Sequence, residues 1–244
     1  MKMTKRIFTL ALAAGMALSL TACRTGGLST DDALKCVQVE MDTTYKGDFK
    51  GFVEFYSNVD TDDAKEQYDA NIEGETSYFF SIAGCVDPED QNSVVEPSEM
   101  QTVRAEKLYE QIYAKSDYTV ASASKQDDGT FSVKVNIKPI NILTLVMDNM
   151  ESHFADFTAK YDALDLDSMS DEEFLNWYRT VYAPDYYDTL LDLLEAQIPN
   201  IGYEDERSIV IQVQQSEDGS LYISTDDLRN LDNLIMDYSG GSEN

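Results

Sequence analysis

Residues 117–138 read DYTVASASKQDDGTFSVKVNIK and contain the clearest structural pattern in the chain. Apolar and polar residues alternate over 131–137, as they do in a strand with one buried face. Residues 118–124 form a matching strand, and Asp128-Gly129 between the two is a favoured turn sequence. The stretch therefore predicts a β-hairpin.

A second hairpin is predicted near the C-terminus. Residues 209–213 alternate in the same way, and Asp218-Gly219 separates them from a short apolar strand at 221–223. We expect the two hairpins to pair in one small antiparallel sheet.

Apolar residues at helical spacing fill the regions around the hairpins. Acidic and hydroxyl residues that favour helix starts precede these regions, and Gly47 ends the first helix. The predicted helix starts are Ser29, Asp48, Thr61, Ser98 and Thr225. The last of these helices ends near Met236.

Residues 141–206 are predicted to form an acidic helical segment between the two hairpins. An apolar stripe runs from Ile142 to Tyr161, Ser170 and Glu173 form a capping box, and a further helix follows Pro184. This segment contains 16 acidic and two basic residues, whereas residues 99–140 contain six of each. The simplest explanation is that the acids solvate the outer faces of the helices. The alternative is a surface that faces a cationic partner or divalent ions.

Together these patterns predict a predominantly helical α+β fold, in which two β-hairpins form a small antiparallel sheet packed against helices. No linker rich in Gly, Ser or Pro divides the chain after its first 29 residues. We therefore expect a single domain over residues 30–238, which includes the acidic helical segment 141–206, and a flexible tail over 239–244.

The first 23 residues predict a location outside the cytoplasm. Basic residues within 2–6 precede an apolar run at 7–20, the pattern of a signal peptide that is too short to span a bilayer. The run ends in LTAC at 20–23, a lipobox in which cleavage between Ala22 and Cys23 leaves Cys23 to be lipidated. We expect a signal peptide at 1–22 and a lipidated Cys23 on a short tether at 23–29, rather than an ordinary signal peptide with a coincidental cysteine.

The net charge limits the partners of this chain. It has 46 acidic and 18 basic residues, which gives a formal charge of −28. Such a charge repels a phosphate backbone, which excludes nucleic-acid binding. It also repels an anionic membrane surface, so we expect attachment to the membrane to depend on the lipid anchor.

The lipobox, the helix after it, YKGDF at 45–49 and DYTV at 117–120 resemble certain lipoproteins of Gram-positive bacteria. These lipoproteins carry a domain of unknown function, and some are similar to the cystatin-like or NTF2-like class. The resemblance implies an extracytoplasmic location and an α+β fold, here NTF2-like with residues 141–206 as a helical insertion. It implies no activity.

Cys36 and Cys85 leave two alternatives open. Outside the cytoplasm they can form a disulfide, which would close a loop of about 50 residues and stabilise the fold by roughly 4 kcal/mol. Otherwise both are buried free thiols that pack as small apolar side chains. Two cysteines so far apart do not predict a zinc site.

The sequence contains no recognisable catalytic constellation. It lacks the GxSxG, GK[ST], GxGxxG and HExxH motifs. His153 has Asp156 three residues further on, but a boundary histidine explains that pair better than catalysis does. We therefore predict no enzyme activity and no cofactor.

A metal site is not predicted either. Asp165, Asp167 and Asp171 are spaced as in a calcium loop, but Ser170 and Asn176 stand where that loop needs glycine and glutamate.

Trp177, Tyr178, Tyr182 and Tyr186 form a candidate binding surface. Exposed aromatic rings stack on sugars or anchor a protein partner. The same spacing is typical of the buried face of a helix, which is the explanation we favour.

Three functional hypotheses follow, in order of preference. The first is a membrane-anchored extracytoplasmic lipoprotein that binds an unknown partner without catalysis. The second is a module that binds a small molecule in a pocket between sheet and helices. The third is an envelope hydrolase that uses two carboxyl groups facing each other in a deep cleft, one of them with a raised pKa.

Overall fold

The computed structural model describes residues 28–56, 59–216 and 221–236. The predicted signal peptide, Cys23, the Asp218-Gly219 turn and the predicted tail at 239–244 lie outside these residues.

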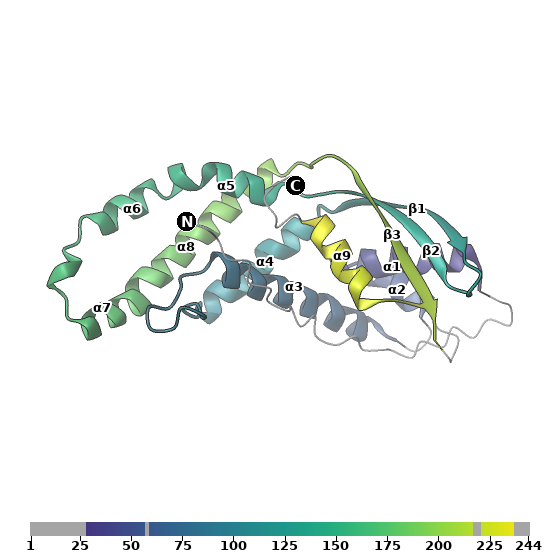
Figure 1. Cartoon of the computed structure of the whole chain (residues 1–244), viewed down its shortest axis with the longest axis horizontal. Coiled ribbons are helices and arrows are strands. Elements are labelled where there is room, and N and C mark those ends of the chain that lie inside the picture. The colour runs from purple at the N-terminus through teal and green to yellow at the C-terminus, as the bar shows by residue number, and fades with distance from the viewer. Residues whose placement is uncertain (1–27, 57–58, 217–220, 237–244) are drawn as a thin grey trace.

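Four strands and nine α-helices occur in the described part of the chain (Figure 1). The strands are β1 (Asp117–Lys125), β2 (Phe131–Lys138), β3 (Arg207–Gln215) and β4 (Leu221–Ile223). The helices are α1 (Thr30–Lys46), α2 (Phe49–Phe55), α3 (Thr61–Ala83), α4 (Glu99–Tyr113), α5 (Ile142–His153), α6 (Ala155–Asp162), α7 (Asp171–Trp177), α8 (Ala183–Gln197) and α9 (Thr225–Ile235).

The strands form one antiparallel sheet in the order β1-β2-β3-β4. This confirms the predicted α+β class and the pairing of the two hairpins. Strands β2 and β3 are central, with Val135 opposite Ile209. Edge strand β1 contains a register shift between Val120 and Ser122, which marks a bulge.

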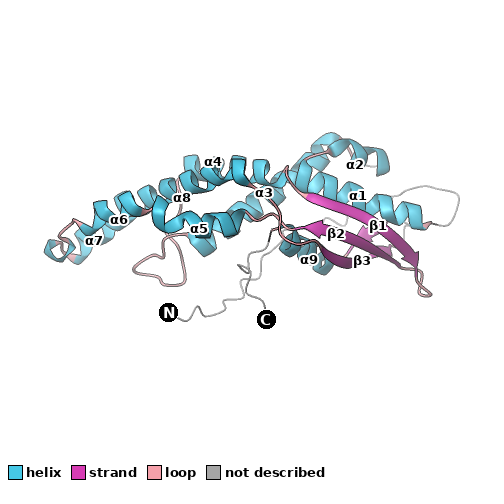
Figure 2. Ribbon diagram, turned by 90° about the horizontal axis from the view of Figure 1, so that it is seen from above, coloured by secondary structure: helices cyan, strands magenta, loops and turns pink. Residues whose placement is uncertain are grey.

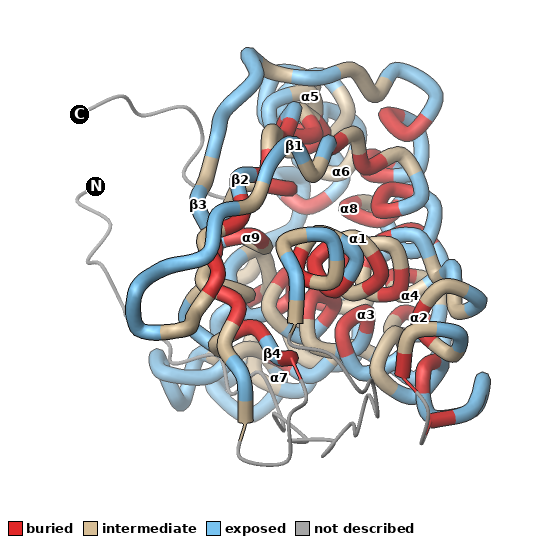
Figure 3. Tube along the Cα trace, turned by 90° about the vertical axis from the view of Figure 1, so that its right-hand side faces the viewer, coloured by how far each residue is buried: buried red, intermediate tan, exposed pale blue. Residues whose placement is uncertain are grey.

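The core lies between one face of the sheet and helices α1 and α9, which both pack against it (Figure 2). The alternating apolar residues of β2, from Phe131 to Ile137, point to this face and are buried. Ile211 and Val213 of β3 continue the same layer. In Figure 3 the buried segments accordingly gather between the sheet and the helices behind it.

Helix capping explains why most helices begin where the sequence predicts. Ser29 and Ser98 each form a capping box, and Gly47 ends α1 with a φ of 62°, a conformation that favours glycine. Helices α3 and α9 begin at Thr61 and Thr225 as predicted, but the capping residue is one position earlier than expected in each. Asp60, not Thr61, caps α3 because its side chain accepts two backbone N–H groups, and Ser224 likewise caps α9.

The molecule is elongated (Figure 1). We call β1–β4 with α1, α2 and α9 the sheet lobe, and residues 142–197, which contain α5 to α8, the helical arm. Helix α8 packs against α5 and α4, which joins the arm to the remaining helices.

The chain enters and leaves the arm at one place, which we call the arm root (residues 139–141 and 202–204). Here the Glu204 N–H donates to the Pro139 carbonyl at 2.9 Å. The Gly202 N–H donates to the Asn141 side chain at 2.8 Å. Ile140 forms bridges to Tyr203 and to Met236 at the end of α9. The end of α9 therefore contacts the base of the arm directly.

Candidate functional site

A cluster of aromatic rings runs along the inside of the helical arm. Neighbouring rings lie 4.7 to 5.9 Å apart between centroids, typical of edge and offset contacts. Its members are Phe154, Phe157, Tyr161, Phe174, Trp177, Tyr178, Tyr182 and Tyr186. All but Tyr161 are half-buried. The arm is too thin to bury them as the core of the sheet lobe buries its side chains.

The chain between α7 and α8 is a π-helical segment, Tyr178–Tyr182, where the sequence predicts a regular helix. The Tyr178 and Tyr182 rings stack there at 5.1 Å with planes 19° apart. The wider turn also places Val181 outward, 45% exposed. Single π turns occur often at functional sites, so this segment marks the arm as more than a spacer.

Tyrosine hydroxyls bind the arm to the chain that joins α3 to α4. Tyr178 donates to the Val86 carbonyl at 3.1 Å, and Tyr186 donates to the Ala83 carbonyl at 3.0 Å. Tyr187, which is fully buried, donates to the Val95 carbonyl at 2.5 Å. The polar ends of Tyr178 and Tyr186 are therefore engaged within the molecule, while Trp177 and Tyr182 lie among the rings of the cluster.

Arg179 adds an ion pair to the same contact. Its guanidinium donates to both carboxylate oxygens of Asp87, at 2.9 and 2.6 Å, and to Glu89 at 2.7 Å. The hydrogen bonds from Arg179 lower the pKa of Asp87 below its ordinary value. We call residues 84–97, which these contacts hold, the strap.

The outer surface of the arm is acidic with isolated apolar side chains. Both basic residues of 141–206 form ion pairs within the molecule, Arg179 with the strap and Lys160 with Asp185 at 2.7 Å. Met147 is 62% exposed, and Leu164 and Met150 are also solvent-accessible. Methionine side chains adapt to irregular partner surfaces.

Cys36 and Cys85 are free and buried, so the disulfide between them that the sequence left open is absent from the structure. The Cys36 sulfur lies 3.4 Å from the Tyr56 hydroxyl. Cys85 belongs to the strap, and its N–H donates to the Tyr187 hydroxyl at 3.2 Å. Burial raises the pKa of the Cys85 thiol to about 11. Cys36 and Cys85 thus pack within the hydrophobic core as separate thiols.

A buried acidic cluster that the sequence analysis missed lies between α1, α3, α4 and α9. The Tyr45 hydroxyl donates to the Asp232 carboxylate at 2.5 Å. Burial, and then repulsion from Glu75, raises the pKa of Asp232 to about 7 against the hydrogen bond from Tyr45. Residues 45, 75 and 232 are far apart in the chain, and no local pattern links them.

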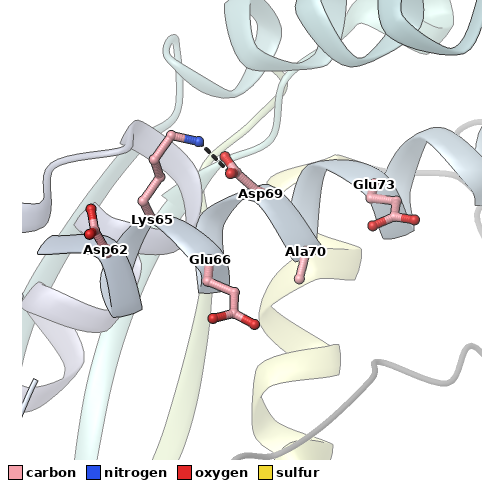
Figure 4. A pocket seen from close by; sticks show the side chains of 6 residues that line it. All are labelled: Asp62, Lys65, Glu66, Asp69, Ala70 and Glu73. Atoms are coloured by element: carbon pink, nitrogen blue, oxygen red, sulfur yellow. Dashed lines mark hydrogen bonds and ion pairs between the residues drawn. The ribbon is translucent and has the colours of Figure 1, made fainter. Parts of the chain in front are cut away.

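The carboxyl groups of Glu75 and Asp232 lie apart from the surface depression that the structure shows on α3. Glu75 is only 8% exposed and belongs to the inward face of α3. The surface depression of about 340 Å³ that the structure contains lies on the outward face of α3 (Figure 4). Its lining residues are Asp62, Lys65, Glu66, Asp69, Ala70 and Glu73, with Lys65 paired to Asp69. It is an open, charged groove on one helix.

The space predicted for a small-molecule pocket, between the sheet and its helices, is occupied by side chains. Val133, Val135 and Ile137 of β2 have no exposed surface there, and neither have Ala33 and Val37 of α1. These positions give the pocket hypothesis no support, and it stays a prediction.

The remaining candidates stay apart. His153 is half-buried at the end of α5, with its ring 6.3 Å from that of Phe154. Asp165, Asp167 and Asp171 are exposed near the tip of the arm, and the described residues contain no group of three acidic, histidine or cysteine side chains placed to hold a metal. Within the same residues, every helix is too short or too polar to cross a bilayer.

The structure defines an elongated α+β protein with a small antiparallel sheet at one end and an acidic, aromatic-rich helical arm at the other. Neither a protein-family model nor a curated protein sequence matches the chain. Among solved structures it is similar to the candidate lipoprotein ycdA of Bacillus subtilis subsp. subtilis strain 168, with 15% identity and a TM-score of 0.46. The match covers 83% of this chain and 55% of that chain, and likeness at this level carries no argument about function.

Proposed function

We propose that the chain is an extracytoplasmic lipoprotein, anchored to the membrane through Cys23, that binds a protein partner with its helical arm and performs no catalysis. The observation that carries the anchor is the lipobox LTAC at 20–23 behind a signal-peptide pattern. Ser29 caps α1 only six residues after Cys23, so the tether spans roughly 20 Å when extended. The folded part would stay close to the bilayer.

The arm supports the partner-binding role. It combines a net charge of −14 over residues 141–206 with exposed Met147 and Val181. A partner that fits this surface has basic side chains around an apolar contact, because complementary charge steers association and a buried apolar contact holds it. The core of the sheet lobe is filled by side chains and the rings of the arm pack on one another, which supports binding on the outer surface rather than inside the fold.

The anchor is tested by replacing Cys23 with alanine in the full chain, expressed in a Gram-positive host with lipoprotein processing. We expect the parent chain to incorporate a labelled fatty acid and to sediment with membranes after a carbonate wash. The Cys23→Ala variant should do neither. Cys36→Ala, which removes a buried thiol, is the matched control and should keep the label. Membrane retention of Cys23→Ala would contradict the anchor.

The binding surface is tested with a photo-crosslinking amino acid placed at four positions in living cells. Met147 and Val181 on the arm are 62% and 45% exposed, and Val210 and Tyr222 on the sheet are 54% and 44% exposed. We expect discrete protein adducts from the two arm positions and none from the two sheet positions. Equal crosslinking from both regions, or from neither, would contradict the role of the arm, whatever the result for the anchor.

A further inference from the structure

Beyond the proposed function, we propose that Asp232 and Glu75 form a proton-controlled clasp, in which loss of a proton loosens helix α9 from the arm root. The geometry places these two carboxyl groups where α9 meets α1, α3 and α4. Asp232 is half-buried, Glu75 is buried, and the Tyr45 hydroxyl that donates to Asp232 is fully buried.

One buried hydroxyl of the cluster, that of Tyr113, lacks a hydrogen-bond partner among the described residues. Tyr113 of α4 is fully buried beside Tyr45, with ring centroids 5.6 Å apart, and lies close enough to Glu75 and Asp232 to feel their charges. Buried polar groups in proteins are nearly always paired, so an orphaned hydroxyl beside two carboxyl groups marks a site that is incompletely stabilised.

Burial, the largest cause, and repulsion from the Glu75 carboxylate of α3 favour the protonated form of Asp232, while the hydrogen bond from the Tyr45 hydroxyl of α1 opposes it. The Tyr113 hydroxyl of α4 is also within electrostatic range of Asp232. Tyr118 of β1 lies against Tyr45, while Lys46 is directed to the Tyr118 ring and to Asp42. On α9 itself, Arg229 pairs with Asp226, 3.2 Å away.

The site is connected to the arm root by one helical turn. The N–H of Met236 donates to the Asp232 carbonyl, and the Ile140 N–H donates to the Ile235 carbonyl at 2.9 Å. Ile140 also bridges Tyr203 on the returning chain. A change in the packing of α9 around Asp232 would therefore alter the contacts of both chain segments that join the arm to the sheet.

The direction of the pH effect follows from linkage. Because the pKa of Asp232 rises from 3.8 to about 7 on docking, docking of α9 is most favourable below pH 4 and weakens as the pH rises towards 7. With one proton involved, the docking equilibrium changes by at most about tenfold per pH unit in that window and levels off above it.

Hydrogen exchange of the full chain between pH 5 and pH 8, corrected for the intrinsic exchange rate, tests the clasp. We expect the amides of α9 and of Ile140 to lose protection up to pH about 7, while those of α4 change less. Asp232→Asn keeps an acceptor for Tyr45 and should remove the pH dependence. Asp226→Asn, on the exposed side of α9, should leave it unchanged.

Two further variants should shift the pH at which α9 loses protection from hydrogen exchange, in opposite directions. Glu75→Gln removes the repulsion and should shift it to lower pH, whereas Tyr45→Phe removes the stabilising hydrogen bond and should shift it to higher pH. A pH profile that survives in Asp232→Asn, or equal pH dependence of α4 and α9, would overturn the clasp.

Discussion

The sheet lobe and the helical arm use side chains of similar chemistry in different ways. In the lobe, apolar side chains such as Phe131 and Ile137 are almost completely buried. In the arm, rings such as Phe157 and Tyr182 are half-buried, and tyrosine hydroxyls hold the arm to the strap and to the end of α3. The comparison teaches that the lobe and the inner part of the arm, with side chains such as Leu191 and Leu194 of α8, are stabilised by the exclusion of water. The outer part of the arm, α6 and α7 with the π-helical segment, depends more on polar contacts made by large amphipathic side chains.

The largest difference should appear when a ring is removed from each region. Phe131→Ala leaves a cavity in the core and should lower the free energy of unfolding by about 3–5 kcal/mol. Phe157 in the arm is only half-buried, so Phe157→Ala removes less buried apolar surface. It should lower the free energy of unfolding by roughly 1–2 kcal/mol. Urea unfolding at 25 °C measures both. An equal or larger loss for Phe157 would show that the arm has a core of its own.

Removing one hydroxyl should have the next largest effect. Tyr187→Phe leaves two buried backbone groups, the Val95 carbonyl and the Cys85 N–H, without their hydrogen-bond partner. This should lower the free energy of unfolding by about 1–3 kcal/mol. Tyr222→Phe, whose exposed hydroxyl donates to Gln214, is the control and should change stability by less than about 0.5 kcal/mol. Similar losses in the two variants would argue against the importance of the strap.

Breaking the ion pair between Arg179 of the arm and the strap should loosen the strap without lowering the stability of the whole fold. Arg179→Gln should speed proteolysis within residues 84–97 with little change in the unfolding midpoint, because its partners Asp87 and Glu89 are on the strap itself. Asp87 has a lowered pKa, so this contribution is present above the ordinary aspartate value of about 3.9 and is lost as the pH falls through the lowered value.

The strap variant has a matched control. Arg229→Gln breaks an exposed pair with Asp226 in the sheet lobe and should leave the proteolysis pattern of the strap unchanged. Faster cleavage of α4 rather than of residues 84–97 in Arg179→Gln would contradict the local effect.

Added salt should give the smallest effect, and it should stabilise the arm, whereas the mutations destabilise the regions in which they lie. Raising the ionic strength from 10 to 200 mM shortens the Debye length from about 30 Å to roughly 7–8 Å and screens repulsion among the acids of residues 141–206. Hydrogen exchange in α6 and α7 should slow, while that in β1 and β2 stays constant, because residues 99–140 are neutral overall. Equal slowing in both regions would indicate a general salt effect.

Local patterns predicted most of the fold. Alternation over 131–137 and the Asp128-Gly129 turn were sufficient for the first hairpin, and capping residues such as Ser98 and Ser170 placed helix starts to the residue. These features depend on neighbours within a few positions, so the physical cause is visible in the sequence itself.

The missed features depend on distant partners. Arg179 and Asp87 are 92 positions apart, and Tyr45 and Asp232 are 187 apart, so no periodicity connects them. The π turn at 178–182 was missed for the same reason. Tyr178 and Arg179 within this turn bind the strap, and that contact cannot be seen in the spacing of the apolar residues.

The closeness of the two chain crossings at the arm root has a consequence for how this architecture can change over evolution. Since Pro139 and Glu204 are hydrogen-bonded neighbours, the residues between them leave and rejoin the sheet at adjacent positions. Insertions or deletions of whole helical turns near the arm tip, further from the arm root than Tyr178, would not alter the register of β2 with β3. Among descendants of one ancestral gene, we therefore expect length differences to gather at the tip and the spacing of the four strands to be inherited unchanged.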